Sequence, residues 1–382
     1  MSDPLDLGLD GLLAEARAAT SLADFGAPDP SEGLAVLLAT YERAGLRPGG
    51  RKRTHGRIVQ LLANRLKIAK AFRDHPEILA RRIVRPMYLT GLPRTGTSAL
   101  FNLLAIDPAA RPLLTWEGMF PDPLGSPLAA GAEDPRLVGL RAYYARQRAK
   151  DPDFDKIHYV DADTPEECVL LLAHAFRDVQ IGIEPLMSPY REWFEAQDLR
   201  PAYAYYRDLL KLLDWQRPGK RWLLKSPAHL WALDVLVELF PDCSIVQTHR
   251  DPREILASYC SMMGALMSIR ESYDKVELGH AVLDHLATAI TRGMRTRDAS
   301  DPARFLDVDY RGFLADPMAT VERIYAHFAL PLDGGVADAM RAHVAANPQS
   351  KHGRHDYSLA EYGLDAEAVR ARFSEYTSRF DL

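Results

Sequence analysis

The sequence is poor in cysteine: only Cys168, Cys243 and Cys260 occur among its 382 residues. They lie far apart or in apolar stretches, and no pair has the C-x-x-C spacing of redox or metal sites. The cysteines therefore indicate no metal centre, and they favour a reducing, intracellular compartment.

Long apolar runs are also missing. No stretch approaches the roughly 18 apolar residues that a membrane-spanning helix needs. The N-terminus, MSDPLDLGLDGLL, is acidic and lacks the basic start and apolar run of a secretory signal. We therefore expect a cytoplasmic protein without a membrane span.

An excess of positive charge is absent as well. The chain has 47 Lys and Arg against 52 Asp and Glu, which gives a formal net charge of -5. As a whole it does not resemble a polyanion-binding protein, so no nucleic-acid partner is expected. With 47% hydrophobic and 26% charged residues, it has the composition of an ordinary globular protein.

Residues 1–82 form the first predicted region, which is helical. Apolar residues recur at helical spacing within 11–20, 32–45 and 55–72. The segment LRPGGRKRTHGR, residues 46–57, is interpreted as a basic turn between two of these helices. We assign the region as a helical cap or an oligomer contact, the latter in a homodimer.

Residues 83–382 form the second predicted region, in which short apolar runs end abruptly and lead into helices. Strands are predicted from Met87, over 221–225, over 243–249 and over 304–310, with a helical insertion at about 117–220. A separate helix is predicted in 162–176, with Thr164 as its cap. Strands that alternate with helices indicate an α/β fold with a mainly parallel sheet, whose strand ends share one ligand-binding edge.

The segment GLPRTGTS, residues 91–98, has the spacing of a phosphate-binding P-loop but lacks the lysine of that loop. Gly91, Gly96 and Ser98 fit G-x-x-x-x-G-K-[ST], and Thr97 occupies the lysine position. The cation is instead Arg94, whose planar guanidinium can bind two oxygens of a terminal group. Such a loop suits a ligand whose terminal group carries less charge than a γ-phosphate.

This segment follows a predicted strand, precedes a predicted helix and has the pattern G-x-P-R-[ST]-G-T-[ST]. It resembles the 5′-phosphosulfate loop of sulfotransferases that use 3′-phosphoadenosine 5′-phosphosulfate (PAPS). The arginine form is similar to the bacterial branch. The resemblance extends from residue 87 to about 355 and implies a three-layer, P-loop-like α/β fold. It also implies PAPS as donor, adenosine 3′,5′-bisphosphate (PAP) as product and no required metal. One departure is at Ala99 and Leu100, because cytosolic members often carry a tryptophan after the loop hydroxyls.

The resemblance also assigns the donor site. Arg250 and Ser258, eight residues apart, match the arginine and serine that bind the 3′-phosphate. Lys225 matches a lysine near the phosphosulfate, and Tyr310 matches a tyrosine beside the adenine. The remaining assigned residues are those of the 5′-phosphosulfate loop and of a late basic loop: Pro93, Arg94, Thr95, Gly96, Thr97, Ser98, Lys351, Gly353 and Arg354. His352 and His355 lack a third metal ligand and are interpreted as residues of that late loop or of the surface.

Two residues compete as the base that accepts the proton of the acceptor. Glu117 lies close to the position of the catalytic glutamate in the tyrosylprotein branch, and His229 lies two residues after the histidine position of cytosolic enzymes. We favour Glu117, because the offset places His229 inside a helix. Arg94 and Lys225 would stabilise the transferring group.

The sequence thus predicts a sulfotransferase that acts on a hydroxyl, or with lower preference an amine, of a small and mainly apolar acceptor. The aromatic residues of the insertion suggest an apolar pocket, although they fit a core equally well. A P-loop kinase that uses ATP, and a nucleotide-binding protein without turnover, are the alternatives.

Overall fold

The computed structural model describes residues 7–125, 128, 131–150, 160–177, 187–347 and 358–382. The chain divides into two compact units. Unit 1 contains Met1–Ile83, Leu114–Pro218 and Leu266–Tyr273, and unit 2 contains Val84–Leu113, Gly219–Ala265 and Asp274–Leu382. No helix among the described residues is long and apolar enough to cross a membrane.

The described part of unit 1 contains helices and isolated β-bridges but no named strand. Its elements are α1 Leu9–Thr20, α2 Ser31–Ala44, α3 Pro48–Asp74, α4 Glu77–Ala80, α6 Thr115–Met119, α7 Pro135–Lys150, α8 Val169–Leu172, the 3₁₀-helix η1 Ala173–Ala175, α9 Tyr190–Glu195 and α10 Arg200–Gln216. The three N-terminal helices predicted from apolar spacing are present as α1, α2 and α3.

Two local predictions for unit 1 were wrong. The basic segment 46–57 is not a turn, because α3 already begins at Pro48, a residue favoured in the first helical turn. Gly50 lets this first turn pack against Ile269, since a Cβ at position 50 would meet Ile269 O at 2.4 Å. Thr164 caps no helix: α8 begins only at Val169, and Thr164 O accepts from Thr115 N.

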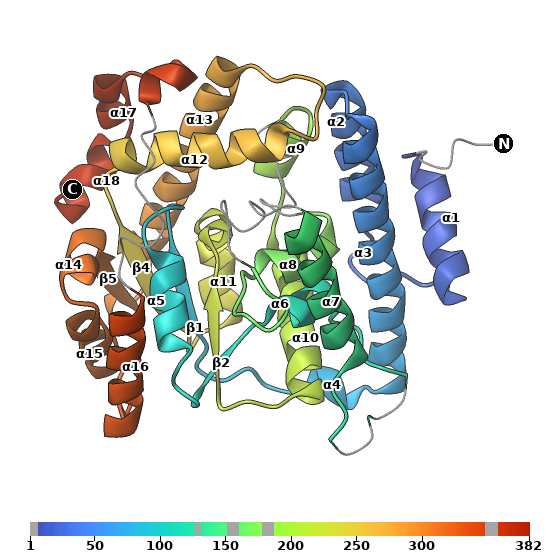
Figure 1. Cartoon of the computed structure of the whole chain (residues 1–382), viewed down its shortest axis with the longest axis horizontal. Helices are drawn as coiled ribbons and strands as arrows, with labels where there is room; N and C mark the ends of the chain where they lie inside the picture. Colours follow the sequence, from blue (N-terminus) through green and yellow to red (C-terminus); the bar gives the residue numbers. More distant parts are fainter. Residues whose placement is uncertain (1–6, 126–127, 129–130, 151–159, 178–186, 348–357) are drawn as a thin grey trace. The chain divides into compact units, whose positions relative to one another are not determined.

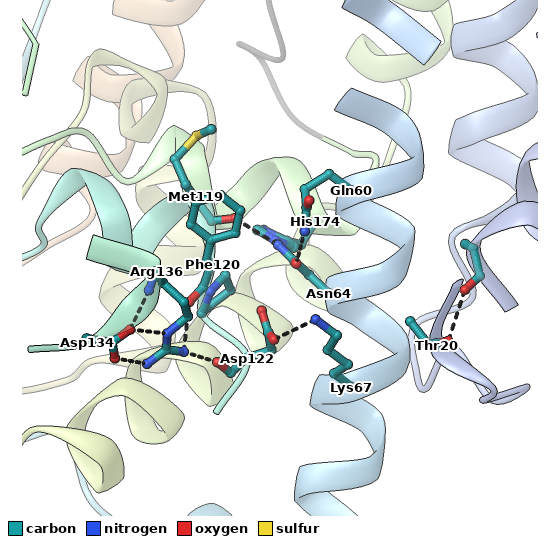
Figure 2. Close-up of polar contacts among 12 residues, drawn as sticks. Thr20, Gln60, Asn64, Lys67, Met119, Phe120, Asp122, Asp134, Arg136 and His174 are labelled. Carbon is teal, nitrogen blue, oxygen red and sulfur yellow. Dashed lines mark hydrogen bonds and ion pairs between the residues drawn. The ribbon is translucent and has the colours of Figure 1, made fainter. Parts of the chain in front are cut away.

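A buried polar network joins three segments of unit 1 (Figure 2). Asn64 Nδ2, on α3, donates to Met119 O at 2.9 Å and lies 3.0 Å from His174 Nε2. Asn64 Oδ1 accepts from Gln60 Nε2 at 2.7 Å. His174 Nδ1 lies 3.0 Å from Leu170 O, so the neutral ring donates there and accepts from Asn64. Burial lowers the pKa of His174 to about 3.

Unit 2 is a five-stranded α/β unit with the strand order β2-β3-β1-β4-β5, and every registered pair is parallel. Its elements are β1 Met87–Gly91, α5 Thr97–Leu104, β2 Ala110–Pro112, β3 Arg221–Lys225, the 3₁₀-helix η3 Pro227–Ala232, α11 Leu233–Leu239, β4 Ser244–His249, α12 Pro252–Met267, α13 Lys275–Asp298, the 3₁₀-helix η4 Pro302–Arg304, β5 Phe305–Asp309, α14 Tyr310–Ala315, α15 Pro317–His327, α16 Gly334–Ala346, the 3₁₀-helix η6 Leu359–Tyr362, α17 Ala366–Arg372 and α18 Ser374–Phe380. The predicted α/β class and parallel sheet are confirmed.

Helices cover both faces of this sheet. On one face, Leu89 and Val246 belong to an apolar cluster with residues of α5, α15 and α16, three helices that lie together in Figure 1. On the other face, Tyr88 packs against His229 of η3, and α13 and α18 contact the end of β4. Because side chains alternate along a strand, neighbouring residues of β1 supply both layers.

The carboxyl ends of four strands carry the predicted donor-site residues. β1 leads into the loop at Gly91, β3 ends at Lys225, β4 is followed by Arg250, and β5 is followed by Tyr310. Parallel strands bring these ends to one edge of the sheet, where α/β folds bind ligands. The short strand β2 was not predicted.

Candidate active site

The two loop glycines allow close approaches that a side chain would block. A Cβ on Gly91, which has φ +144°, would meet Thr248 O of β4 at 2.5 Å. A Cβ on Gly96, with φ +84°, would meet the Tyr310 ring at 2.9 Å. Because glycine has no Cβ, these two residues let the loop pack closely between β4 and the first residue of α14.

Arg94 has a left-handed backbone conformation, with φ +66°, that non-glycine residues rarely adopt. Its neighbour Thr95 holds the loop in this shape, because Thr95 Oγ1 lies 2.6 Å from both Leu92 O and Thr248 Oγ1. The Thr95 hydroxyl is buried, whereas Arg94 is exposed. The loop is a fixed frame that presents the Arg94 side chain outward.

Helix α5 begins directly after the loop, at Thr97, without a side-chain cap. Its first N–H groups and its dipole are thus available for an anion. Lys225 Nζ, at the end of β3, donates to Ser98 Oγ at 3.0 Å, although only 2% of the lysine residue is exposed. This contact brings together the predicted loop serine and the predicted lysine.

The predicted 3′-phosphate residues lie beside the loop. Arg94 Nε donates to Ser258 Oγ on α12 at 3.2 Å, and Arg250 donates from a terminal nitrogen to Arg94 O at 3.1 Å. The Arg250 guanidinium also lies over the Tyr310 ring, 4.3 Å from its centroid. Arg94, Arg250, Ser258 and Tyr310 therefore form one cluster at the carboxyl edge of the sheet.

Two further residues of this cluster were not among the predicted site residues. Glu254 accepts from Arg250 Nε at 3.0 Å and from a terminal nitrogen of Arg311 at 3.0 Å. The pKa of Glu254 lies below its ordinary value: burial raises it, but the bonds from the two arginines lower it more. The i,i+4 spacing of Arg250 and Glu254 on a predicted helix was the available sequence signal.

Glu117, the favoured base, belongs to unit 1 and is 1% exposed. Its carboxylate accepts from Arg217 Nε at 2.9 Å, from a second Arg217 nitrogen at 3.0 Å and from Leu114 N at 3.1 Å. These bonds fix the orientation of the Glu117 carboxylate on α6.

His229 belongs to η3 of unit 2 and is fully buried. Its ring meets the Tyr88 ring edge-on, with 5.2 Å between the centroids. Burial lowers the pKa of His229 to about 3, so its imidazole is a weak proton acceptor at neutral pH. Ser226 caps this element, since its side chain accepts from Ala228 N at 3.1 Å.

Lys351, Gly353 and Arg354, the predicted late basic loop, lie outside the described residues. Among the residues that the structure does describe, no group of three His, Cys, Asp or Glu side chains could hold a metal ion.

A sequence model of the sulfotransferase family matches residues 86–334, well over half of the chain. The match includes the phosphate loop, Lys225, Arg250, Ser258 and Tyr310. The chain belongs to the sulfotransferase family. The membership predicted from the loop is thereby confirmed.

Solved sulfotransferases share the fold of this family member along almost its whole length. Sulfotransferase STF1 from Mycobacterium tuberculosis H37Rv is 35% identical, with a TM-score of 0.85 over 96% of this chain and 98% of its own. Sulfotransferase STF9 from Mycobacterium avium is 29% identical, with a TM-score of 0.90 over 100% of this chain and 99% of its own.

A curated relative of this sulfotransferase family member is the omega-hydroxy-beta-dihydromenaquinone-9 sulfotransferase Stf3 of Mycobacterium bovis, which shares 24% identity over 253 residues. The same protein from Mycobacterium tuberculosis strain CDC 1551 / Oshkosh matches equally. The matched segment is 64% of this chain and 63% of the relative, so the chain spans less than two thirds of the relative's length.

Proposed function

We propose that the protein transfers a sulfuryl group from PAPS to a hydroxyl group of a small, mainly apolar acceptor. The observation that carries this proposal is the contact of the phosphate loop with the 3′-phosphate pair. Arg94 of the loop bonds Ser258, and Arg250 bonds the backbone of Arg94. A donor with phosphates at both the 5′ and 3′ positions would engage both parts of this cluster.

Each group has a role in the proposed transfer. The base takes the proton of the acceptor hydroxyl, the acceptor oxygen forms a bond to sulfur, and the bond from sulfur to the bridging oxygen breaks. The electron pair of that bond leaves on the 5′-phosphate of PAP. Lys225, Arg94 and the N–H groups at the start of α5 would stabilise the charge that develops on the sulfuryl group and the bridging oxygen.

Glu117 remains our proposed base. Burial lowers the pKa of the alternative, His229, to about 3, which makes it a poor acceptor of a hydroxyl proton at neutral pH. The bonds from Arg217 would keep the Glu117 carboxylate in one orientation, which favours proton transfer over a mobile side chain.

An apolar acceptor is supported by the relative named as an omega-hydroxy-beta-dihydromenaquinone-9 sulfotransferase. That name describes a hydroxyl on a lipid-like molecule. We therefore prefer phenols, sterols, lipids and other apolar alcohols to sugars, and hydroxyls to amines.

The test compares ligands by calorimetry. We expect the protein to bind PAP, and to bind ATP with Mg²⁺ much more weakly. Arg250→Ala should weaken PAP binding about tenfold or more through loss of a charge-assisted contact, whereas Arg341→Ala, on the exposed part of α16, should not. Tight ATP binding without affinity for PAP would favour the kinase alternative instead.

Turnover is tested with labelled PAPS and a panel of apolar alcohols. Label should move to an acceptor in the presence of the protein. If PAP binds tightly but no acceptor in a broad panel is labelled, the protein is a nucleotide-binding member without turnover.

A further inference from the structure

Arg311 lies next to the proposed donor site but is not part of the predicted set. It is the second residue of α14, whose first residue, Tyr310, packs against Gly96 of the loop and under the Arg250 guanidinium. Asp309 caps this helix by accepting from Gly312 N at 2.7 Å. The backbone that carries Arg311 is therefore held close to the loop.

Glu254 joins Arg311 to Arg250. One oxygen of its carboxylate accepts from Arg250 Nε and the other from Arg311, each at 3.0 Å. One carboxylate thus holds two guanidinium groups beside each other and leaves a local net charge of +1. The neighbouring Asp251 and Arg253 form a separate bidentate pair, so they do not cancel this charge.

This geometry points to a second arginine for the phosphate of the ligand. A phosphate dianion is held best by more than one cation, and guanidinium groups suit its oxygens. Arg250 already uses two of its nitrogens on Glu254 and Arg94 O. Arg311 has a side chain that is 69% exposed, so it can turn toward an anion without a large loss of packing.

We propose that Arg311 binds the 3′-phosphate of the donor together with Arg250, and that Glu254 places the two arginines. Arg311 would then determine specificity for the 3′-phosphorylated donor over the same nucleotide without that phosphate. This inference rests on the proposed function. The opposite interpretation is an exposed ion pair of Arg311 and Glu254 that contributes little to any function.

The experiment measures the binding of PAP and of adenosine 5′-monophosphate by calorimetry, for the wild type and three variants. Arg311→Ala should weaken PAP binding by about tenfold or more, because a charge-assisted contact is lost. Binding of the monophosphate should change by less than about twofold. Arg311→Lys keeps the positive charge but not the planar guanidinium, so its affinity for PAP should lie between those of the wild type and Arg311→Ala. Arg341→Ala should bind PAP as tightly as the wild type.

Two results would overturn the inference. Arg311→Ala could bind PAP as tightly as the wild type, or it could lose affinity for both nucleotides equally. A wild type that binds neither nucleotide would instead refute the proposed function. Thermal unfolding of each variant shows whether the chain has stayed folded, and an exposed arginine should change the unfolding temperature little.

Discussion

At the residue scale, Lys225 is the buried cation of the proposed site. It lies at the end of β3, is 2% exposed and donates to Ser98. Its ammonium is also 5.9 Å from the centroid of the Phe101 ring. Keeping such a charge inside a protein is costly, which favours a function for it over a purely structural role.

Replacing Lys225 with methionine keeps the length of the side chain and removes its charge. We expect kcat for sulfuryl transfer to fall by about 10²-fold or more, because charge that develops in the transition state loses a fixed cation. Lys220→Met, at an exposed position before the same strand, is the matched control. A Lys225→Met enzyme with an unchanged kcat would remove Lys225 from the proposed mechanism.

Glu117 allows a second test at this scale, because a base and a structural ion pair respond differently. Glu117→Gln keeps the shape and an oxygen for Leu114 N or Arg217 but cannot take a proton. If Glu117 is the base, the kcat of Glu117→Gln should be lower than that of the wild type by about 10²-fold or more. Asp134→Asn, a carboxylate of unit 1 paired with Arg136, is the control and should lose stability only.

The opposite pattern would make Glu117 structural. A Glu117→Gln protein that keeps its kcat but unfolds at a lower urea concentration than the wild type would show that the bond to Arg217 stabilises unit 1 and has no role in catalysis.

At the scale of elements, apolar runs bounded by polar turns predicted four strands closely. The segment RWLLK is β3 over its whole length, and β4 and β5 differ from their predictions only at the ends. The strand β2 was missed because its three residues, Ala110–Pro112, contain no apolar run; it exists because it pairs with β3. A three-residue edge strand depends on its neighbour more than on its own sequence.

In the candidate site, too, local sequence patterns predicted some features, whereas contacts between distant residues were not predicted. The loop and the spacing of Arg250 and Ser258 are local patterns that identified the family. The bond from Glu254 to Arg311 joins residues 57 positions apart in the chain, so no local pattern indicates it. The start of α3 was missed for a related reason: Gly50 weakens a helix locally, but its packing against Ile269 requires a residue without a side chain.

Helix α18 holds the end of β4 from the face of the sheet that α13 also contacts. Tyr376 donates to His249 Nδ1 at 3.1 Å, and His249 Nε2 donates to Asp307 at 2.8 Å. Helix α18 therefore bonds the residue that directly precedes the proposed 3′-phosphate arginine.

Tyr376→Phe removes only the hydroxyl of this network. It should lower the free energy of unfolding by about 1–3 kcal/mol, because buried partners lose a hydrogen bond. It should also weaken PAP binding, since His249, which directly precedes Arg250, loses a hydrogen bond that holds it in place. Urea unfolding and calorimetry measure the two effects. Tyr143→Phe, at a side chain that is 45% exposed, should change neither; unchanged stability in Tyr376→Phe would contradict this role.

At the scale of the whole molecule, both units contain buried histidines that are kept neutral. Burial lowers the pKa of His174 in unit 1 and of His229 in unit 2 to about 3. It also lowers the pKa of His249, although the bond to Asp307 opposes that shift. Protonation of His174 would place an N–H group against the Asn64 amide, which is itself a donor there.

These shifts predict that both units lose stability in mild acid. An unfolded histidine has a pKa of about 6.5, so below that pH the unfolded chain binds protons that the folded chain excludes. The free energy of unfolding should therefore fall between about pH 6.5 and pH 5, by up to about 1.4 kcal/mol per pH unit for each buried histidine. Asp307, whose pKa is depressed, adds to the loss only at lower pH, where unfolded carboxylates take up protons.

Urea unfolding followed from neutral pH into this range measures the slope directly. His174→Gln cannot take up the proton, so it should reduce the slope for unit 1 and leave the contribution of unit 2 in place. His280→Gln, at an exposed position of α13, is the matched control and should keep the slope of the wild type. Stability that stays constant from neutral pH down to about pH 5 would mean that these imidazoles are protonated in the folded protein, against the tautomer that the Asn64 contact requires.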